Sequence, residues 1–130
     1  IGAAGHPEVR AICGRCEGAK VVANAQELEK LLNDEPNLRS ESVTVVVQTT
    51  QTEENLKECE ILIKKWCTNA EIFDTICSAT STRQTEAIKL ASECDAMVVI
   101  GGRDSANVAP IPSSLTGPGR LIPKRWRTRR

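Results

Sequence analysis

The sequence predicts an α/β domain built on a mostly parallel sheet with helices on both faces. Short β-branched runs alternate with amphipathic segments along residues 1–107, which is typical of strands joined by crossover helices. Four valines fall within residues 43–47, and such a continuous run of β-branched residues indicates a strand buried on both faces. Aromatic residues make up only 2% of the chain, so the predicted core is aliphatic.

The length of 130 residues is enough for one modest domain. The formal net charge is zero, but residues 1–107 hold 11 basic and 17 acidic residues, whereas residues 108–130 hold six basic residues and no acid. We find no apolar run long enough for a transmembrane helix and no secretory leader. With six cysteines, this favours a reducing compartment. Because the chain begins at Ile1 inside an apparent strand, we expect a piece of a longer protein.

The first half of the chain predicts two helices and three strands. Residues 1–5 are the tail of a strand, and Pro7 opens a short helix that reaches about Ile12. A short strand is expected over residues 20–23. Asn24 and Glu27 form an N-cap pair for the next helix, which ends at residues 34–37. The valine-rich strand follows over residues 42–48.

The second half repeats the alternation. A capping box at Thr50 and Glu53 begins a helix whose buried stripe includes Cys59. A strand is expected over residues 70–75. Ser81 and Gln84 are read as the next capping box, and the helical spacing of the following apolar residues places Cys94 in the core. The last strand spans residues 96–100 and runs into a Gly-Gly turn.

The tail, residues 108–130, is a separate region of the predicted domain organisation. It contains several prolines and glycines, so we expect an extended or disordered segment, or an aberrant end, rather than a helix. Its basic residues could bind nucleic acid nonspecifically, but we do not interpret them as functional.

Polar side chains follow the carboxyl ends of four predicted strands, and in a parallel sheet all four ends lie at one edge. They hold His6 with Glu8, Thr49 with Thr50, Cys77 with Thr80, and Ser105 with Asn107. The carboxylate is suited to proton transfer, and the neutral donors are suited to phosphate oxygens. The alternative for each exit is ordinary turn and cap chemistry.

Cys77 follows a strand and precedes a helix, where the positive end of the helix favours the thiolate that metals and iron–sulfur clusters require. The alternative is a small buried hydrophobe. Cys13 and Cys16 form a C-x-x-C, which could serve a redox or zinc module, but no second pair stands at zinc-site spacing. We interpret that motif as incidental.

These segments together resemble one family, the 4-hydroxy-3-methylbut-2-enyl diphosphate reductases, which complete the methylerythritol phosphate route to isoprenoids. The resemblance covers about residues 1–107. It rests on Gly5-His6-Pro7-Glu8-Val9, Gln48-Thr49-Thr50, Asp74-Thr75-Ile76-Cys77-Ser78-Ala79-Thr80 with Arg83-Gln84, and Val99-Ile100-Gly101-Gly102 with Ser105 and Asn107.

The resemblance implies a three-unit α/β reductase with a 4Fe–4S cluster, which converts an allylic diphosphate to isopentenyl and dimethylallyl diphosphate. It implies that Cys77 is a cluster ligand, that Glu8 delivers a proton, and that Thr49 lies beside the substrate hydroxyl. The remaining implied contacts, to the diphosphate and its pocket, come from His6, Thr80, Ser105, Ala106 and Asn107.

The resemblance also implies an electron donor such as ferredoxin or flavodoxin, and a location in the bacterial cytoplasm or the plastid, with no nucleic-acid or membrane partner. Two features depart from the family. Ala106 stands where the family has a serine, and the two other cluster cysteines have no counterpart in this chain. We therefore expect an incomplete and inactive fragment. The alternative function is a noncatalytic α/β module that binds an anion at the sheet edge.

Overall fold

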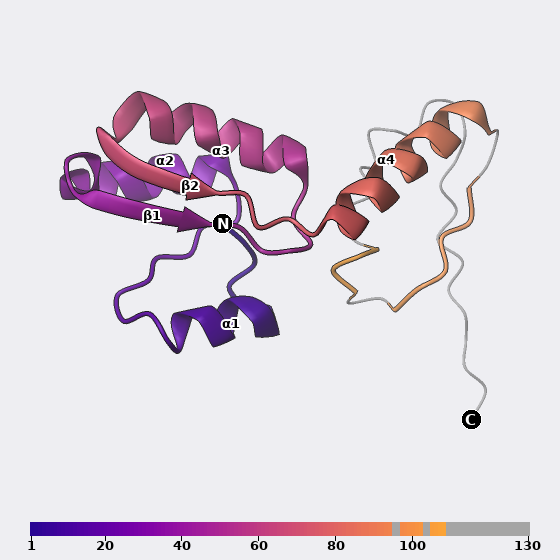
Figure 1. The fold of residues 1–130 in the computed structure, drawn as a ribbon, viewed down its shortest axis with the longest axis horizontal. Coiled ribbons are helices and arrows are strands. Elements are labelled where there is room, and N and C mark those ends of the chain that lie inside the picture. The colour runs from indigo at the N-terminus through magenta and orange to yellow at the C-terminus, as the bar shows by residue number, and fades with distance from the viewer. Residues whose placement is uncertain (95–96, 103–104, 109–130) are drawn as a thin grey trace. The chain divides into compact units, whose positions relative to one another are not determined.

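The computed structural model describes residues 1–94, 97–102 and 105–108. These residues fall into two compact units, Ile1–Cys77 and a second that begins at Ser78, and each is described by itself. The predicted boundary between residues 107 and 108 stays a prediction, and residues 109–130 of the predicted tail lie outside the described residues. The elements of the first unit, traced in Figure 1, are α1 (Pro7–Cys13), α2 (Ala25–Asp34), the 3-10 helix η1 (Pro36–Arg39), β1 (Ser42–Val46), α3 (Glu53–Trp66) and β2 (Asn69–Phe73).

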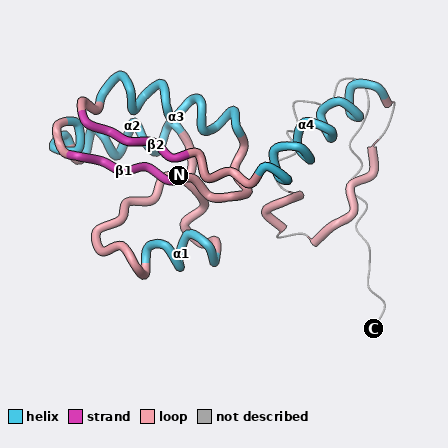
Figure 2. The backbone as a smooth tube through the Cα atoms, in the orientation of Figure 1, coloured by secondary structure: helices cyan, strands magenta, loops and turns pink. Residues whose placement is uncertain are grey.

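The two strands of the first unit lie side by side and run parallel (Figure 2). Their register pairs Ser42 with Asn69 at one end and Val46 with Phe73 at the other. The connection between them is α3, which is the βαβ arrangement expected for parallel neighbours. The α/β class is therefore confirmed, and the carboxyl ends of both strands lie at the same edge.

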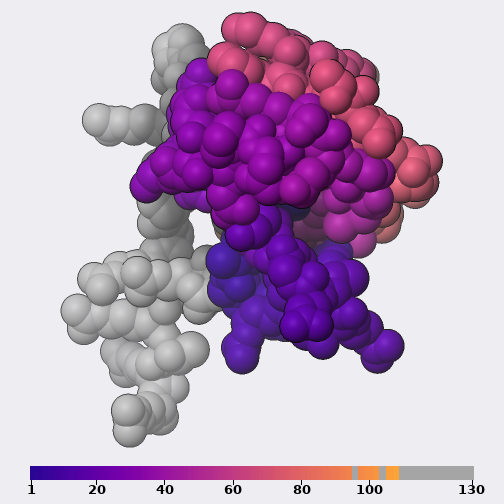
Figure 3. All heavy atoms as spheres, turned by 90° about the vertical axis from the view of Figure 1, so that its left-hand side faces the viewer, coloured from indigo at the N-terminus to yellow at the C-terminus, as the bar shows by residue number. Residues whose placement is uncertain are grey.

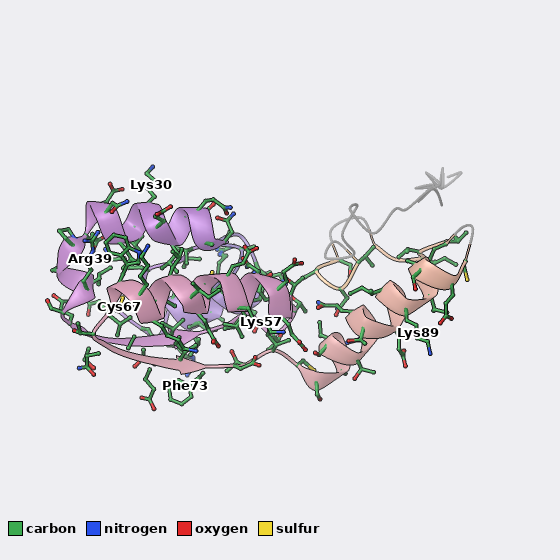
Figure 4. All side chains as sticks on the ribbon, turned by 90° about the horizontal axis from the view of Figure 1, so that it is seen from above. Lys30, Arg39, Lys57, Cys67, Phe73 and Lys89 are labelled. Atoms are coloured by element: carbon green, nitrogen blue, oxygen red, sulfur yellow. The ribbon has the colours of Figure 1, made fainter. Side chains whose placement is uncertain are left out.

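One face of this sheet packs on helices and the other is exposed. Val45 and Ile72 point into the core, whereas Val46 is 37% and Phe73 is 45% exposed. In Figure 4, Phe73 points away from the helices. The prediction of a strand buried on both faces was therefore wrong for β1, because no element of the unit Ile1–Cys77 covers its outer face.

The core lies between the sheet and the pair α2 and α3. Leu28 and Leu32 of α2 pack with Cys59 and Ile63 of α3, and Cys59 is fully buried. The predicted cap of α2 is confirmed, because the Asn24 side chain accepts a hydrogen bond from the Glu27 backbone N–H at 3.0 Å. The prediction that Cys59 is a core residue is also confirmed.

The N-cap of α3 is Thr52, not Thr50. The Thr52 hydroxyl accepts a hydrogen bond from the Asn55 backbone N–H at 3.2 Å. The Thr50 hydroxyl is instead 2.7 Å from the Gln48 side-chain nitrogen, from which it accepts a hydrogen bond. The predicted capping box at Thr50 was therefore wrong by two residues, because the Gln48 side chain engages the Thr50 hydroxyl and α3 begins only at Glu53.

The N-terminal residues run beside β1 with sheet-like hydrogen bonds. The backbone nitrogen of Ile1 donates to Val46 O at 2.7 Å, and the Gly2 nitrogen donates to Val22 O at 2.8 Å. These contacts involve the two segments that we expected to be strands, although neither is a regular strand in the structure. In Figure 3 the indigo atoms of the N-terminal residues lie below the magenta body of the unit.

The second unit contains α4 (Ser78–Glu93), which begins three residues before the predicted cap at Ser81. Cys94 is exposed, so its prediction as a core residue was wrong. Residues 97–100 form no strand, and Val98 and Ile100 are 71% and 88% exposed, whereas Ala96 lies outside the described residues. The predicted strand was therefore wrong for residues 97–100, because in the described residues of this unit no neighbouring strand pairs with them.

Among the residues that the structure describes, no helix combines the length and the apolar composition that crossing a bilayer requires.

Candidate functional site

The centre of the candidate site is the contact between Glu8 and Thr49. The Thr49 backbone N–H donates to Glu8 Oε1 at 2.9 Å, and the Thr49 hydroxyl donates to Glu8 Oε2 at 2.8 Å. Glu8 lies in the first turn of α1, and Thr49 follows β1. Two donors on one threonine thus fix both oxygens of a partly buried carboxylate, which is the geometry of a held proton donor or acceptor.

His6 caps the helix that carries Glu8. The Glu8 backbone N–H donates to His6 Nδ1 at 3.3 Å, and the same ring nitrogen lies 4.0 Å from Glu8 Oε2. The His6 and Glu8 side chains are 28% and 27% exposed, so both reach solvent. Because Nδ1 accepts the Glu8 N–H, the Nε2–H is the donor that this ring offers to an anionic ligand.

Gln48 fixes the segment that leads into His6. Gln48 is buried, its side-chain Oε1 accepts from the Ala3 backbone N–H at 2.9 Å, and its Nε2 donates to the Thr50 hydroxyl. Its own backbone N–H donates to Ile1 O at 2.8 Å. A buried amide with both ends paired is well suited to hold two backbone segments at a set distance.

Cys77 joins the same arrangement through its backbone. The Cys77 N–H donates to Thr49 O at 2.9 Å, and Cys77 is exposed. The preceding residues shape this approach: the Asp74 carboxylate accepts from the Ile76 N–H at 2.9 Å, and the Thr75 hydroxyl contacts the backbone of Val47. The structure therefore brings together four of the residues that we singled out, namely His6, Glu8, Thr49 and Cys77.

The other predicted site residues belong to the second unit. Thr80 is 3% exposed on α4, and Ser105 and Ala106 are half-buried in a turn that ends in the exposed Asn107. The Val108 N–H donates to Ser105 O at 2.9 Å, which closes that turn. Their approach to Glu8 and Cys77 stays a prediction, because the two units are described separately.

The thiols differ in surroundings. Burial raises the pKa of the Cys59 thiol, and burial also raises the pKa of Cys67, which the nearby Arg39 opposes. Cys13 is half-buried and Cys16 is exposed.

The described residues contain no group of three or more His, Cys, Asp or Glu that could hold a metal ion. One thiolate at Cys77 cannot bind four irons, so the residues of this chain do not by themselves fit a 4Fe–4S cluster.

Two residues of this arrangement were not predicted to have a role, Gln48 and Thr75. Both stand in segments that carried the family resemblance. The signal that could have found Gln48 is a polar residue directly after an apolar strand, since such a residue is buried only when it has partners.

Comparison with known proteins gives one family. The family model described as LytB protein matches residues 1–113. The 4-hydroxy-3-methylbut-2-enyl diphosphate reductases of Geobacter sulfurreducens and Aquifex aeolicus are 46% and 40% identical over 110 residues. Each match covers 82% of this chain and 36% of the relative, so the chain spans about a third of the length of these curated relatives.

A solved structure also matches. It is the (E)-4-hydroxy-3-methyl-but-2-enyl diphosphate reductase, titled the terminal enzyme of the non-mevalonate pathway. The match has 32% sequence identity and a TM-score of 0.47, and it covers 85% of this chain and 38% of that one.

Proposed function

This chain belongs to the LytB protein family, and we propose that it supplies part of a 4-hydroxy-3-methylbut-2-enyl diphosphate reductase. In this proposal the two-stranded α/β unit is one portion of a three-unit enzyme whose complete sheets carry helices on both faces. The support is the family match together with the site geometry, since Glu8, Thr49 and Cys77 meet at the carboxyl edge of the two strands.

The proposed reaction removes an allylic hydroxyl. Two electrons and two protons convert the carbon–oxygen bond into a carbon–hydrogen bond and one water, and the products are isopentenyl and dimethylallyl diphosphate. The electrons come from a donor such as ferredoxin or flavodoxin, in the bacterial cytoplasm or the plastid. The residues of this chain contribute to the proton and binding parts of that reaction.

Glu8 is the proposed acid, and Thr49 is the residue that presents it to the substrate. A hydroxyl both donates and accepts, so Thr49 Oγ1 can accept a hydrogen bond from a protonated Glu8 while it donates to the leaving hydroxyl. Its contact of 2.8 Å with Glu8 Oε2 is already within proton-transfer range. The pair of hydrogen bonds between Thr49 and Glu8 is the observation that carries the proposal.

The diphosphate of the substrate needs positive charge and neutral donors. His6 is proposed to donate its Nε2–H to it, since Nδ1 accepts from the Glu8 N–H, with the hydroxyls and amides of Thr80, Ser105 and Asn107 as further donors. Ala106 would line this subsite without a donor. Because the second unit is described by itself, this shared pocket is a proposal.

Cys77 is proposed as one ligand of the 4Fe–4S cluster that would transfer the electrons. Its backbone contact to Thr49 would hold the metal ligand and the proton-relay pair next to each other. The described residues hold no group of three or more side chains that could bind a metal ion, so the remaining ligands are proposed to come from other parts of the complete enzyme.

A chimera tests this proposal. Residues 1–107 replace the aligned segment of the Geobacter sulfurreducens reductase, and the purified chimera is assayed anaerobically for substrate reduction. We expect activity in the chimera and at least about a hundredfold loss in Glu8→Gln, since general acids contribute about 10²–10⁴-fold. Glu54→Gln, an exposed carboxylate in the first turn of α3, is the matched control and should retain activity. A fully active Glu8→Gln chimera would refute the assigned acid.

A further inference from the structure

Cys13 and Cys16 lie on one continuous turn of backbone at the end of α1. The Ile12 carbonyl oxygen accepts hydrogen bonds from the N–H groups of Arg15 at 3.0 Å and Cys16 at 3.1 Å. The chain therefore keeps its helical path past Cys13, the last residue of α1, as far as Cys16. Residues three positions apart on such a path are neighbours on the same face, with Cβ atoms about 5–6 Å apart.

Only a small closing of this turn separates the two cysteines from a disulfide, which joins Cβ atoms about 3.5–4.5 Å apart. Cys16 follows the regular helix, and the residue next to Cys13 is Gly14, which has no side chain to obstruct the movement. The movement therefore falls in the turn after α1 rather than within the helix.

The two thiols differ in their access to solvent. Cys16 is exposed and Cys13 is half-buried. Cys13 stands one turn after Val9, a buried core residue on the same face of α1. A small oxidant from solvent would therefore meet Cys16 first, with the thiol of Cys13 held next to it.

A metal ion matches this pair less well than a disulfide does. A structural zinc ion takes four ligands. In the ranges that the structure describes, no cluster of three or more His, Cys, Asp or Glu side chains is placed to hold a metal ion. Two neighbouring thiols are, however, all that reversible disulfide exchange requires of the protein. The spacing alone left the motif incidental, whereas the shared turn and the unequal exposure favour this chemistry.

We propose that Cys13 and Cys16 form a reversible dithiol–disulfide pair that exchanges with a small disulfide such as oxidised glutathione. The pair is a redox-sensitive modification site at the end of the helix that carries Glu8. It does not depend on the proposed function, because neither thiol is assigned to the substrate, the proton or the cluster.

The exchange proceeds in two balanced steps. The Cys16 thiolate attacks one sulfur of oxidised glutathione, which forms a mixed disulfide and releases one glutathione thiolate. The Cys13 thiolate then attacks the Cys16 sulfur, which forms the bond between the two cysteines and releases the second glutathione thiolate. The protein gives up two electrons and two thiol protons, and one oxidised glutathione takes them up and becomes two reduced molecules.

Trypsin provides a direct readout, because it cuts after Arg10, Arg15 and Lys20 and so places the two cysteines in separate peptides, 11–15 and 16–20. The whole folded chain is equilibrated anaerobically with oxidised glutathione and about 0.1 mM reduced glutathione, well below the millimolar effective concentration of a tethered thiol. The sample is then quenched in acid, alkylated, digested and analysed by mass spectrometry. We expect the linked peptides to exceed peptide 16–20 with bound glutathione at least about tenfold.

Three variants separate the roles of the thiols. Cys13→Ser should leave Cys16 as the glutathione adduct, because no second thiol releases the glutathione. Cys16→Ser should abolish the linked peptides. Cys94→Ser is the matched control, because Cys94 is an exposed thiol outside the pair, and it should give the same linkage as the original chain.

Two results would overturn the proposal. The first is a predominant glutathione adduct on Cys16 in the original chain, or no linkage when glutathione already modifies the exposed Cys94. The second comes from the same equilibration in urea, where we expect the ratio of linked peptides to adduct to fall at least about threefold, because the unfolded chain no longer holds both thiols on one turn. An unchanged ratio in urea would show that the fold does not pair the two thiols.

Discussion

Thr49 holds both carboxylate oxygens of Glu8, with its backbone N–H on one and its hydroxyl on the other, across 41 positions of sequence. The same threonine accepts the backbone N–H of Cys77 through its carbonyl oxygen. One residue at the end of β1 therefore connects the helix that carries the carboxylate with the segment that carries the thiol.

Thr49→Val removes one of the two hydrogen bonds to the carboxylate and keeps the other. We expect the free energy of unfolding to fall by about 1–2 kcal/mol, because a charged acceptor in a partly buried place loses a partner. Urea denaturation of the chain measures this. Thr49→Ser keeps the hydroxyl and should stay within about 0.5 kcal/mol of the original. Unchanged stability in Thr49→Val together with a loss in Thr49→Ser would show that the methyl group, not the hydrogen bond, stabilises the contact.

Gly2→Ala should destabilise the site-bearing unit, because there is no room for a methyl group. A Cβ on Gly2 would lie 2.8 Å from Gln48 Cβ and 2.9 Å from Val9 Cγ2. Overpacking of this kind costs about 1–3 kcal/mol. Gly5→Ala is the control, since nothing lies within 4 Å of that position. Both variants are compared by urea denaturation, and equal stability of the two would contradict the tight packing at Gly2.

The sequence was sufficient for the class of fold and for the approach of His6, Glu8, Thr49 and Cys77, whereas the approach of Ser105 and Asn107 stays a prediction. Helical periodicity located α2 and α3, and the cap at Asn24 located the start of α2, because buried stripes and caps are local signals.

The cap at Thr52 was missed because Thr50 and Glu53 match the capping-box pattern, whereas Thr52 is followed three residues later by Asn55. In the structure the Gln48 side chain donates to the Thr50 hydroxyl, and Thr52 caps the helix.

Features that depend on residues distant in sequence could not be predicted from the local sequence. The valines of β1 predicted burial on both faces, but Val46 is paired with the exposed Phe73, and what covers a strand face is not encoded in the strand itself.

The buried thiol of Cys59 should make the unfolding free energy fall as the pH rises. Burial raises the pKa of Cys59, so above about pH 8.5 the unfolded thiol loses its proton while the folded one keeps it. The unfolded state then binds fewer protons and is favoured. Cys67, whose pKa burial also raises, adds to this trend. Urea denaturation between about pH 7.5 and pH 10 measures the slope.

The matched variants for this slope are Cys59→Ala and Cys16→Ala. Cys59→Ala removes the buried thiol and should reduce the slope of the unfolding free energy against pH, whatever effect the substitution has on stability at neutral pH. The second removes an exposed thiol and should leave the dependence unchanged. Equal slopes in both variants would exclude Cys59 as its source.

Ala106→Ser adds a hydroxyl to the turn that holds Ser105 and Asn107. If that turn binds the diphosphate, one new hydrogen bond to a charged oxygen should tighten substrate binding about tenfold or more in the chimeric reductase. Titration calorimetry with the substrate measures the change. Ala11→Ser, at an exposed position of α1, is the control and should bind as before. Unchanged or weaker binding in Ala106→Ser would exclude this position as a donor site.

Iron content gives the most direct test of Cys77. A 4Fe–4S cluster needs several cysteine thiolates, and the described residues hold no group of three suitable ligands. Anaerobic reconstitution of the chain alone should therefore give no stable cluster absorption, whereas the chimera should take up iron through the ligands of its host. In that chimera, Cys77→Ser should lose most of the iron, and Cys94→Ser, at an exposed thiol, should keep it. The chemical reason is that a serine hydroxyl is a far weaker ligand for iron than a thiolate, while the backbone contact of residue 77 with Thr49 survives the exchange of sulfur for oxygen. A full cluster in Cys77→Ser would remove this residue from the metal site and leave the Glu8–Thr49 pair as the remaining support for a reductase.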